Sequence, residues 1–172
     1  HCADVQTATM IGRGETNAQR EQRIKRVRAD YAAFVDYYFP HYTQNAQTGK
    51  QTPCAPFHIK AAKEVKANKN LRAVYRWHRG AAKSTHLDIF IPLWLKCQET
   101  REINVMVLVG KSEDNANPLL ADLQAELQYN QRYINDFGEQ YNSGSWEEGQ
   151  FVTKDGTAFF ARGRGQSPRG LR

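Results

Sequence analysis

An almost unbroken apolar run, Ile103–Val109, limits the possible folds of this chain more than any other segment. A strand with apolar residues at successive positions has both faces buried, which is typical of a central strand in a parallel sheet. A second short run, Leu71–Trp77, is rich in β-forming residues and is followed by a turn at Arg79-Gly80. Two strands joined by a helix form a βαβ unit, so the sequence predicts an α/β fold with a mostly parallel sheet flanked by helices.

Helical periodicity fills much of the chain around these two predicted strands. Apolar residues recur every three or four positions from Asn17 to Pro40, where we expect the first helix to stop. Three further helices are predicted: Pro56 to about Ala67, Lys83–Cys97 with a kink at Pro92, and a helix capped by Ser112 that reaches about Asn130.

The order of these elements divides the chain into three parts. We expect residues 1–16 to be a flexible lead-in, residues 17–55 an N-terminal helical extension with a linker, and residues 56–172 the α/β domain. Near the end of that domain, residues 150–154 and 157–162 flank a turn signal and predict a C-terminal β-hairpin. Because the chain does not begin with Met, we interpret it as either a trimmed chain or a fragment of a longer protein.

Charge and composition restrict the environment and the partners. The formal net charge of +6 favours a polyanion such as nucleic acid or nucleotide. The cations at the start of the first helix either contact DNA or an acidic protein, or form a solvated face; they are Arg20, Arg23, Lys25, Arg26 and Arg28. No apolar run is long enough to span a bilayer, and residues 1–15 do not resemble a signal peptide, so we expect a cytoplasmic protein. The spacing of Cys2, Cys54 and Cys97 predicts free thiols.

The segment that points to chemistry is Arg79-Gly80-Ala81-Ala82-Lys83-Ser84-Thr85, between a predicted strand and a predicted helix. In this position, backbone N–H groups and the helix dipole favour a bound phosphate. Lys83 would bring its charge to the phosphates of a nucleotide, and the Ser84 hydroxyl would ligate Mg²⁺. The segment departs from the pattern G-x-x-x-x-G-K-[ST], because Trp77 and Ala82 occupy the glycine positions. The alternative is an ordinary turn in which Lys83 is a surface lysine.

Residues 79–85, followed by a buried helix, resemble the variant phosphate loop of viral terminase large subunits, the ATPases of phage DNA packaging. Two further segments agree in order: Phe57-His58 resembles a pair found upstream of many terminase loops, and residues 163–172 resemble the Gly-rich stretch before the acidic strand of that family. The resemblance covers roughly residues 30–172. It implies a P-loop NTPase fold with ATP and Mg²⁺ as cofactors.

The resemblance also implies roles for single residues. Arg79 would act as an arginine finger, or else tie the loop to a carboxylate. Phe57 and His58 would flank the adenine, or else be a core phenylalanine and a surface histidine. The remaining residues implied to bind the nucleotide are those of the loop, Gly80, Ala81, Ala82, Lys83, Ser84 and Thr85, with Ser84 as the metal ligand. Gln51 is the nearest candidate for a glutamine that recognises adenine.

For the whole protein, the resemblance implies translocation of double-stranded DNA into a procapsid in the host cytoplasm. The portal protein, the small terminase subunit and a homo-oligomeric ring are its implied partners. In the family, an acidic pair on the next strand holds Mg²⁺ and polarises water. The chain stops at Arg172, before that strand, so we expect an incomplete domain that binds ATP with little turnover. A basic nucleic-acid or protein-binding module without nucleotide turnover is the alternative, and another P-loop enzyme is a third.

Overall fold

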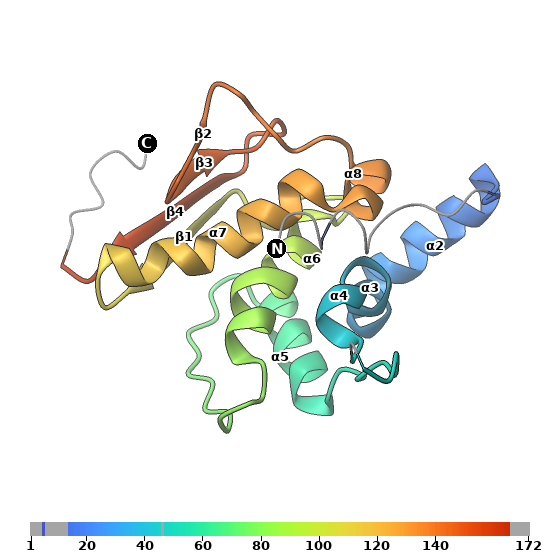
Figure 1. Ribbon diagram of the computed structural model, residues 1–172, viewed down its shortest axis with the longest axis horizontal. Helices are drawn as coiled ribbons and strands as arrows, with labels where there is room; N and C mark the ends of the chain where they lie inside the picture. The colour runs from blue at the N-terminus through green and yellow to red at the C-terminus, as the bar shows by residue number, and fades with distance from the viewer. Residues whose placement is uncertain (1–4, 6–13, 46, 166–172) are drawn as a thin grey trace.

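The computed structural model describes Val5 and residues 14–45 and 47–165. Helices and a small sheet form one connected core, and α2 extends away from the rest of the molecule at the end opposite the sheet (Figure 1). The helices are α2 Asn17–Ala29, α3 Tyr31–Tyr38, α4 Pro40–Thr43, α5 Pro56–Ala67, η1 Thr85–Phe90, α6 Ile91–Lys96, α7 Glu113–Tyr129 and α8 Gln131–Phe137. The strands are β1 Val105–Gly110, β2 Trp146–Glu147, β3 Gln150–Val152 and β4 Ala158–Gly163.

The N-terminal helix predicted to run to Pro40 is interrupted at Asp30. This residue ends α2 in an extended conformation, and its carboxylate accepts the backbone N–H groups of Ala32 and Ala33 at the start of α3. A side chain that caps a helix satisfies donors that the helix itself leaves unpaired, so an aspartate here favours a new helix start over a continuous helix. Pro40 then occupies the first turn of α4, where its missing N–H costs nothing.

The prediction of a strand at Leu71–Trp77 is wrong. The segment belongs to no strand, although its aromatic side chains Tyr75 and Trp77 pack against the core. Val74 is 84% exposed. Strands are stabilised by hydrogen bonds to a neighbouring strand, and within the described residues no strand pairs with this segment. The β-forming composition of the segment therefore does not produce a ladder.

The helix predicted from Lys83 to Cys97 is present as a π-helical turn, η1, followed by α6. Pro92 has no N–H to donate to the carbonyl of Asp88, and the N–H of Ile91 bonds instead to the carbonyl of His86, five residues earlier. A π-helical turn accommodates such a break in the bonding pattern. The irregularity expected at Pro92 thus takes the form of widened backbone in the preceding turn. The buried character of α6 is confirmed, since Leu93 and Trp94 are each 1% exposed.

The sheet is mixed rather than mostly parallel, with the strand order β1-β4-β3-β2. Only the β1–β4 pair is parallel; β3 is antiparallel to both β4 and β2. The apolar run that predicted a central strand forms β1, which lies at an edge of the sheet. Its alternate residues Val105, Val107 and Val109 are 54%, 40% and 63% exposed. An apolar sequence on both faces of a strand therefore does not correspond here to burial on both faces.

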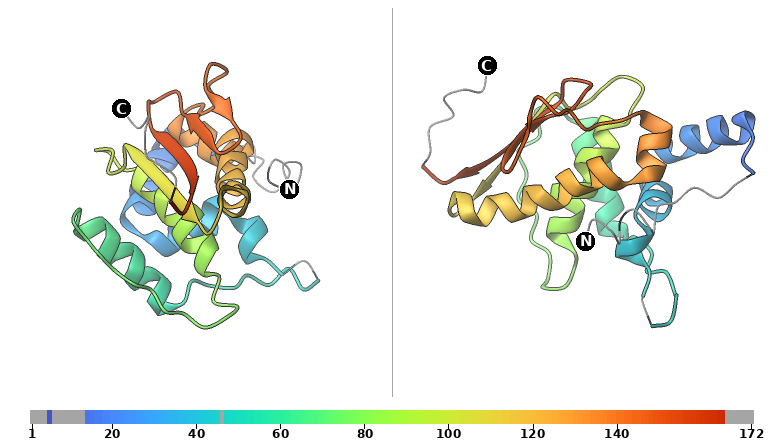
Figure 2. Two further views of the ribbon diagram at one scale, coloured as in Figure 1. Left: turned by 90° about the vertical axis from the view of Figure 1, so that its left-hand side faces the viewer. Right: turned by 45° about the horizontal axis from the view of Figure 1, so that its top comes forward.

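A crossover through α7 connects β1 to the parallel strand β4. Figure 2 shows α7 along one face of the sheet, where it packs against both strands. The predicted helix is confirmed, and Leu120, Leu123 and Leu127 are fully buried; Ser112 occupies the N-cap position, but its side chain makes no capping hydrogen bond. The predicted hairpin is also confirmed: β3 and β4 pair on either side of the Asp155-Gly156 turn. The fold class is α/β.

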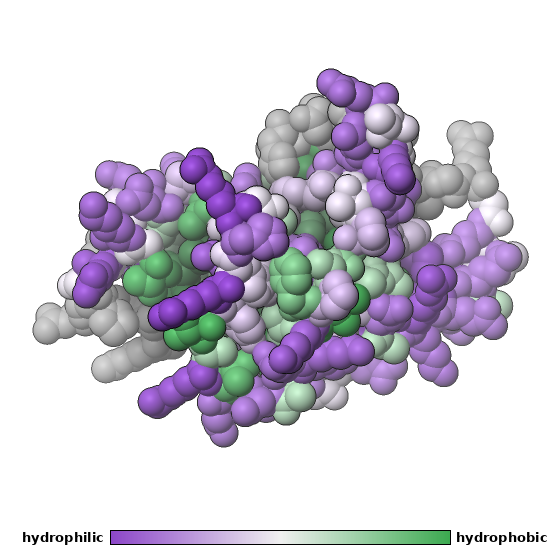
Figure 3. Space-filling model, turned by 90° about the horizontal axis from the view of Figure 1, so that it is seen from below, coloured by the Kyte–Doolittle hydropathy of each residue, from purple (hydrophilic) through white to green (hydrophobic). Residues whose placement is uncertain are grey.

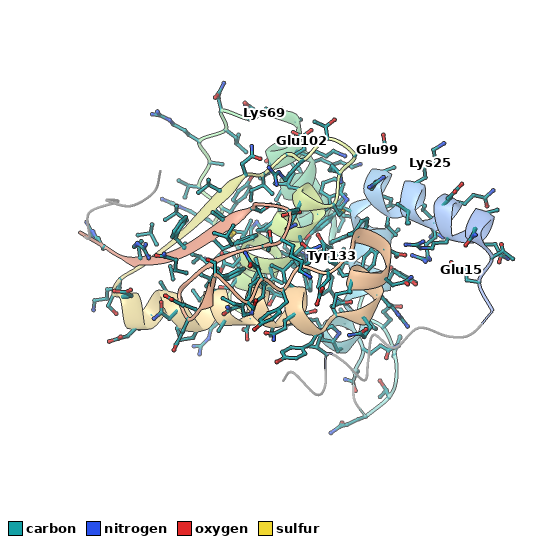
Figure 4. All side chains as sticks on the ribbon, turned by 90° about the horizontal axis from the view of Figure 1, so that it is seen from above. Glu15, Lys25, Lys69, Glu99, Glu102 and Tyr133 are labelled. Atoms are coloured by element: carbon teal, nitrogen blue, oxygen red, sulfur yellow. The ribbon has the colours of Figure 1, made fainter. Side chains whose placement is uncertain are left out.

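Buried Asp136 at the end of α8 explains part of the basic charge on α2. Its carboxylate forms ion pairs with Arg20 and Arg23 and accepts a hydrogen bond from the Tyr38 hydroxyl at 2.7 Å. Burial raises the pKa of Asp136, but the hydrogen bonds from these three residues outweigh burial and leave the pKa below its usual value. Arg23 also pairs with Glu15, which Figure 4 shows beside the outer end of α2. These two arginines therefore attach α2 to the body of the protein.

We predict that neighbouring positions of β1 differ strongly in their contribution to stability. Leu108→Ala should lower the free energy of unfolding by about 2–5 kcal/mol, because it leaves a cavity between β1 and its covering helix. Val107→Ala should cost less than about 1 kcal/mol, because that side chain is partly in water. Urea unfolding followed by circular dichroism measures both values. Equal losses would mean that both faces of β1 are covered in solution.

Candidate functional site

The candidate phosphate loop lies between the extended segment 71–77 and the start of η1. Its backbone takes positive φ at two alternating positions, Gly80 at 84° and Ala82 at 50°. Ala82 is the only residue other than glycine with positive φ in the part of the chain that the structure describes. Non-glycine residues rarely adopt this conformation, because the Cβ atom crowds the backbone. The loop therefore has an unusual backbone where the sequence pattern expects its second glycine.

The polar side chains predicted to act on phosphate and metal all face solvent. Arg79, Lys83 and Ser84 are exposed, whereas Ala81 is 6% exposed and lies against the interior. The loop thus has an inner side that contacts the core and an outer side with two positive charges and a hydroxyl group. A phosphate group approaching the outer side would find cationic and hydroxyl donors.

A cavity of about 360 Å³ adjoins the loop. Its walls come from the linker before α5, from α5, from the loop and from η1, and they include six of the residues predicted to bind a nucleotide: Phe57, His58, Gly80, Ala81, Ala82 and Thr85. Arg79, Lys83 and Ser84 lie outside this lining. Figure 3 shows hydrophobic surface between hydrophilic side chains on the side of the molecule where α5 lies. A larger cavity of about 490 Å³ runs along α2 and is lined by no residue of the predicted site.

Phe57 and His58 occupy different positions relative to this cavity. Phe57 is partly exposed, and its ring packs edge-on against Trp77 with centroids 5.1 Å apart. His58 is 8% exposed, so the expectation of a surface histidine is wrong. Its Nε2 lies 2.8 Å from the carbonyl oxygen of Ala81. The structure therefore brings His58 to the inner side of the loop.

His86 lines the same cavity as His58, and the sequence analysis did not single it out. Its ring stacks on that of His58, with centroids 3.7 Å apart and planes at 19°, and its Nδ1 lies 2.8 Å from the Tyr31 hydroxyl. Burial lowers the pKa of His86 to about 3, with a smaller effect from the neighbouring His58 ring. The only sequence signal was a polar residue in a helix that is otherwise apolar nearly all round.

Asp88 is a second residue beside the loop that the sequence pattern did not single out. It is half-buried, one helical turn after Ser84. Burial raises its pKa, and a hydrogen bond from Ser84 and the charge of Lys83 partly offset that rise. Asp88 thus places a carboxyl group beside the Ser84 hydroxyl, and carboxylate oxygens are among the ligands that suit Mg²⁺. Within residues 14–45 and 47–165, no three His, Cys, Asp or Glu side chains are grouped to hold a metal ion.

The remaining residues and segments named in the sequence analysis have, where the structure describes them, no contact with the loop that supports a role in binding. Gln51 is exposed, is absent from the cavity lining, and bridges to Gln44 instead. Cys54, whose pKa burial raises to about 12, and Cys97 are free thiols as predicted, and Cys2 lies outside the described residues. Of the Gly-rich stretch 163–172, residues 166–172 also lie outside the described residues. No helix of the described chain has the length and apolar character that a membrane span requires.

Comparison with models of known protein families, with curated proteins and with solved structures found no match to this chain. The assignment of a function therefore depends on the geometry of the loop, the cavity and the histidine pair.

We predict that the neutral state of His86 makes stability depend on pH. Because its pKa is lower in the folded chain than the usual 6.5, unfolding takes up a proton, and stability is lost as the pH falls from about 6.5 towards 3. His86→Gln retains an acceptor for the Tyr31 hydroxyl but does not titrate. The difference in unfolding free energy between wild type and His86→Gln should shrink by up to about 3 kcal/mol between pH 6.5 and pH 4. Urea titrations at several pH values measure it, and a constant difference would contradict the prediction.

Proposed function

We propose that this chain is the ATP-binding part of a DNA-packaging motor of the terminase large-subunit type. The observation that carries the proposal is the loop itself. It has positive φ at Gly80 and Ala82, exposes Arg79, Lys83 and Ser84 on its outer side, and borders a cavity of about 360 Å³. The cavity falls in the range of 300–1,000 Å³ that is typical of small-molecule sites, and Arg79, Lys83 and Ser84 lie next to it in the chain but outside its lining.

The residues present fit the phosphates of ATP with Mg²⁺. Bound nucleotide would supply the phosphoryl group whose transfer to water powers the motor. Lys83 would bind the phosphates as a point charge, and the Ser84 hydroxyl would serve as a metal ligand. Arg79, exposed at the start of the loop, would stabilise negative charge as the terminal phosphate leaves. Phe57 would offer an apolar ring to the base from the cavity wall.

In this proposal, the parent protein hydrolyses ATP and moves double-stranded DNA into a procapsid. The portal protein, the small terminase subunit and further copies in a ring would be its partners. Only the sequence resemblance supports these partners, whereas both the resemblance and the structure of the loop support binding of a nucleotide. Nucleotide binding by the loop is therefore the first property to measure.

We predict that the chain binds Mg²⁺·ATP and that Lys83→Ala weakens this binding by about tenfold to a hundredfold, which corresponds to one charge-assisted hydrogen bond of about 1.5–3 kcal/mol. Isothermal titration calorimetry measures the affinity. Lys63→Ala is the matched control, since it removes an exposed lysine of α5 that does not line the cavity. Wild-type protein that fails to bind Mg²⁺·ATP, or equal affinity in both variants, would reject the proposal.

A second candidate function is binding of nucleic acid without use of nucleotide. The cations of α2 give it little support, because Arg20 and Arg23 pair with Asp136, and Arg28 lies 3.6 Å from Glu99. A different set of cations supports it instead. Residues 65–87 contain no Asp or Glu, and five of their cations are exposed: Lys69, Arg72, Arg76, Arg79 and Lys83. One of the five, Lys69, forms an ion pair with Glu102, with 3.3 Å between Nζ and Oε2 (Figure 4), so the support comes from Arg72, Arg76, Arg79 and Lys83.

For this second candidate, we predict salt-dependent binding to double-stranded DNA through the segment 69–83. Replacing Arg72 and Arg76 by alanine should lower the slope of log K against log salt by about 1 for each phosphate group that the variant no longer neutralises. Lys154→Ala, which removes an exposed lysine from the hairpin, should leave the slope unchanged. Fluorescence anisotropy over a salt series measures it. DNA affinity that does not respond to ATP would favour this function over the first.

A further inference from the structure

His58 connects the start of α5 to the loop through both of its ring nitrogens. The backbone N–H of Ala55 donates to Nδ1 at 3.1 Å, and Nε2 lies 2.8 Å from the Ala81 carbonyl oxygen. A ring nitrogen that accepts a hydrogen bond carries no hydrogen, so the hydrogen of neutral His58 is on Nε2 and is donated to that carbonyl. The ring is 8% exposed, so water competes little for either bond.

This hydrogen bond determines the direction of the peptide bond between Ala81 and Ala82. The described chain contains no cis peptide bond, and in a trans peptide the C=O and the following N–H point to opposite sides. A carbonyl held by His58 therefore turns the Ala82 N–H away from the interior. Within the described residues, that N–H has no hydrogen-bond acceptor. Stacking on His86, with centroids 3.7 Å apart, fixes the plane of the His58 ring that holds the carbonyl.

We propose that His58 is a positioning residue of the loop: it keeps the Ala81–Ala82 peptide in the orientation that offers an N–H, rather than a carbonyl oxygen, to a bound phosphate. The identity of the anion rests on the proposed function, but the peptide orientation is a property of the free protein. A flipped peptide would direct the partial negative charge of its carbonyl at the anion. Backbone N–H groups that converge on a concave loop are a general means of binding anions.

Two substitutions at His58 separate this role from simple packing. Glutamine at the third position of a helix can accept the N–H of the cap residue, and its amide can also donate to the Ala81 carbonyl, so His58→Gln is the rescue variant. His58→Leu retains apolar volume and loses both bonds. Ile59→Ala, a partly buried residue of the same helix, is the control for general loss of stability.

The first measurement is made without nucleotide, by NMR amide exchange. The reporters are the N–H groups of Ala81 and His86, which bond to the carbonyls of His78 and Ala82 at 3.3 and 3.0 Å. Exchange should be about tenfold faster in His58→Leu than in the Ile59→Ala control, and His58→Gln should stay close to wild type. Long-range ¹H–¹⁵N correlation should find the ring hydrogen on Nε2. Equal exchange in the leucine variant and the control, a hydrogen on Nδ1, or no rescue by glutamine would each overturn the proposal.

The second measurement titrates Mg²⁺·ATP and pyrophosphate into the same four proteins. His58→Leu should bind each anion about tenfold more weakly than wild type, and His58→Gln should bind like wild type. Leucine-variant affinity equal to that of wild type would overturn the positioning role. If loop exchange responds as expected but wild-type protein binds neither anion, the positioning role of His58 stands and the proposed nucleotide function fails.

Discussion

An aromatic cluster built on α3 holds the helical part of this protein together. Phe34 contacts Tyr38, Phe39 and Tyr133 at centroid distances of 5.1, 5.6 and 6.5 Å, and all four side chains are almost completely buried. Phe39 stacks on Phe90 of η1 at 4.4 Å, so the same cluster reaches the helix that follows the loop. Each aromatic pair contributes about 0.5–1.5 kcal/mol beyond the burial of its area. This cluster therefore links η1 to α8 through the aromatic side chains of α3 and its C-cap residue Phe39.

The histidine pair beneath the candidate loop is held in place by contacts with the same helix, α3. Tyr31 of α3 contacts both Trp94 of α6 and His86 of η1, and His86 in turn stacks on His58 beneath the loop. The inner side of the loop is therefore attached to a buried aromatic layer, while Arg79 and Lys83 are exposed. A loop with one fixed and one solvated side can hold an unusual backbone without closing off access for a ligand.

The sequence predicted those elements whose signals are local. The periodic helices α5, which begins at Pro56, and α7, and the hairpin with its Asp155-Gly156 turn, follow from residues close together in the chain. The strand at Leu71–Trp77 and the position of β1 depended on which distant segments pair, and composition carries no information about that. Phe57, His58 and part of the loop line one cavity, whereas Arg79, Lys83 and Ser84 lie outside its lining; their roles stay predictions. The His58–His86 stack was missed, because a ring contact between residues 28 positions apart leaves no periodic pattern in the sequence.

The pairing of β1 with β4 has a consequence for the order of folding. Val105 pairs with Ala158, so the parallel ladder closes a loop of chain that contains α7, α8, β2 and β3. The entropy of closing so long a loop makes this a late event compared with the formation of local helices. Until it occurs, the β1 segment is unpaired on both edges and carries three valines that are still partly exposed in the folded chain. Refolding is therefore a competition between intramolecular closure and strand pairing with other chains, and dilution shifts that competition towards the monomer.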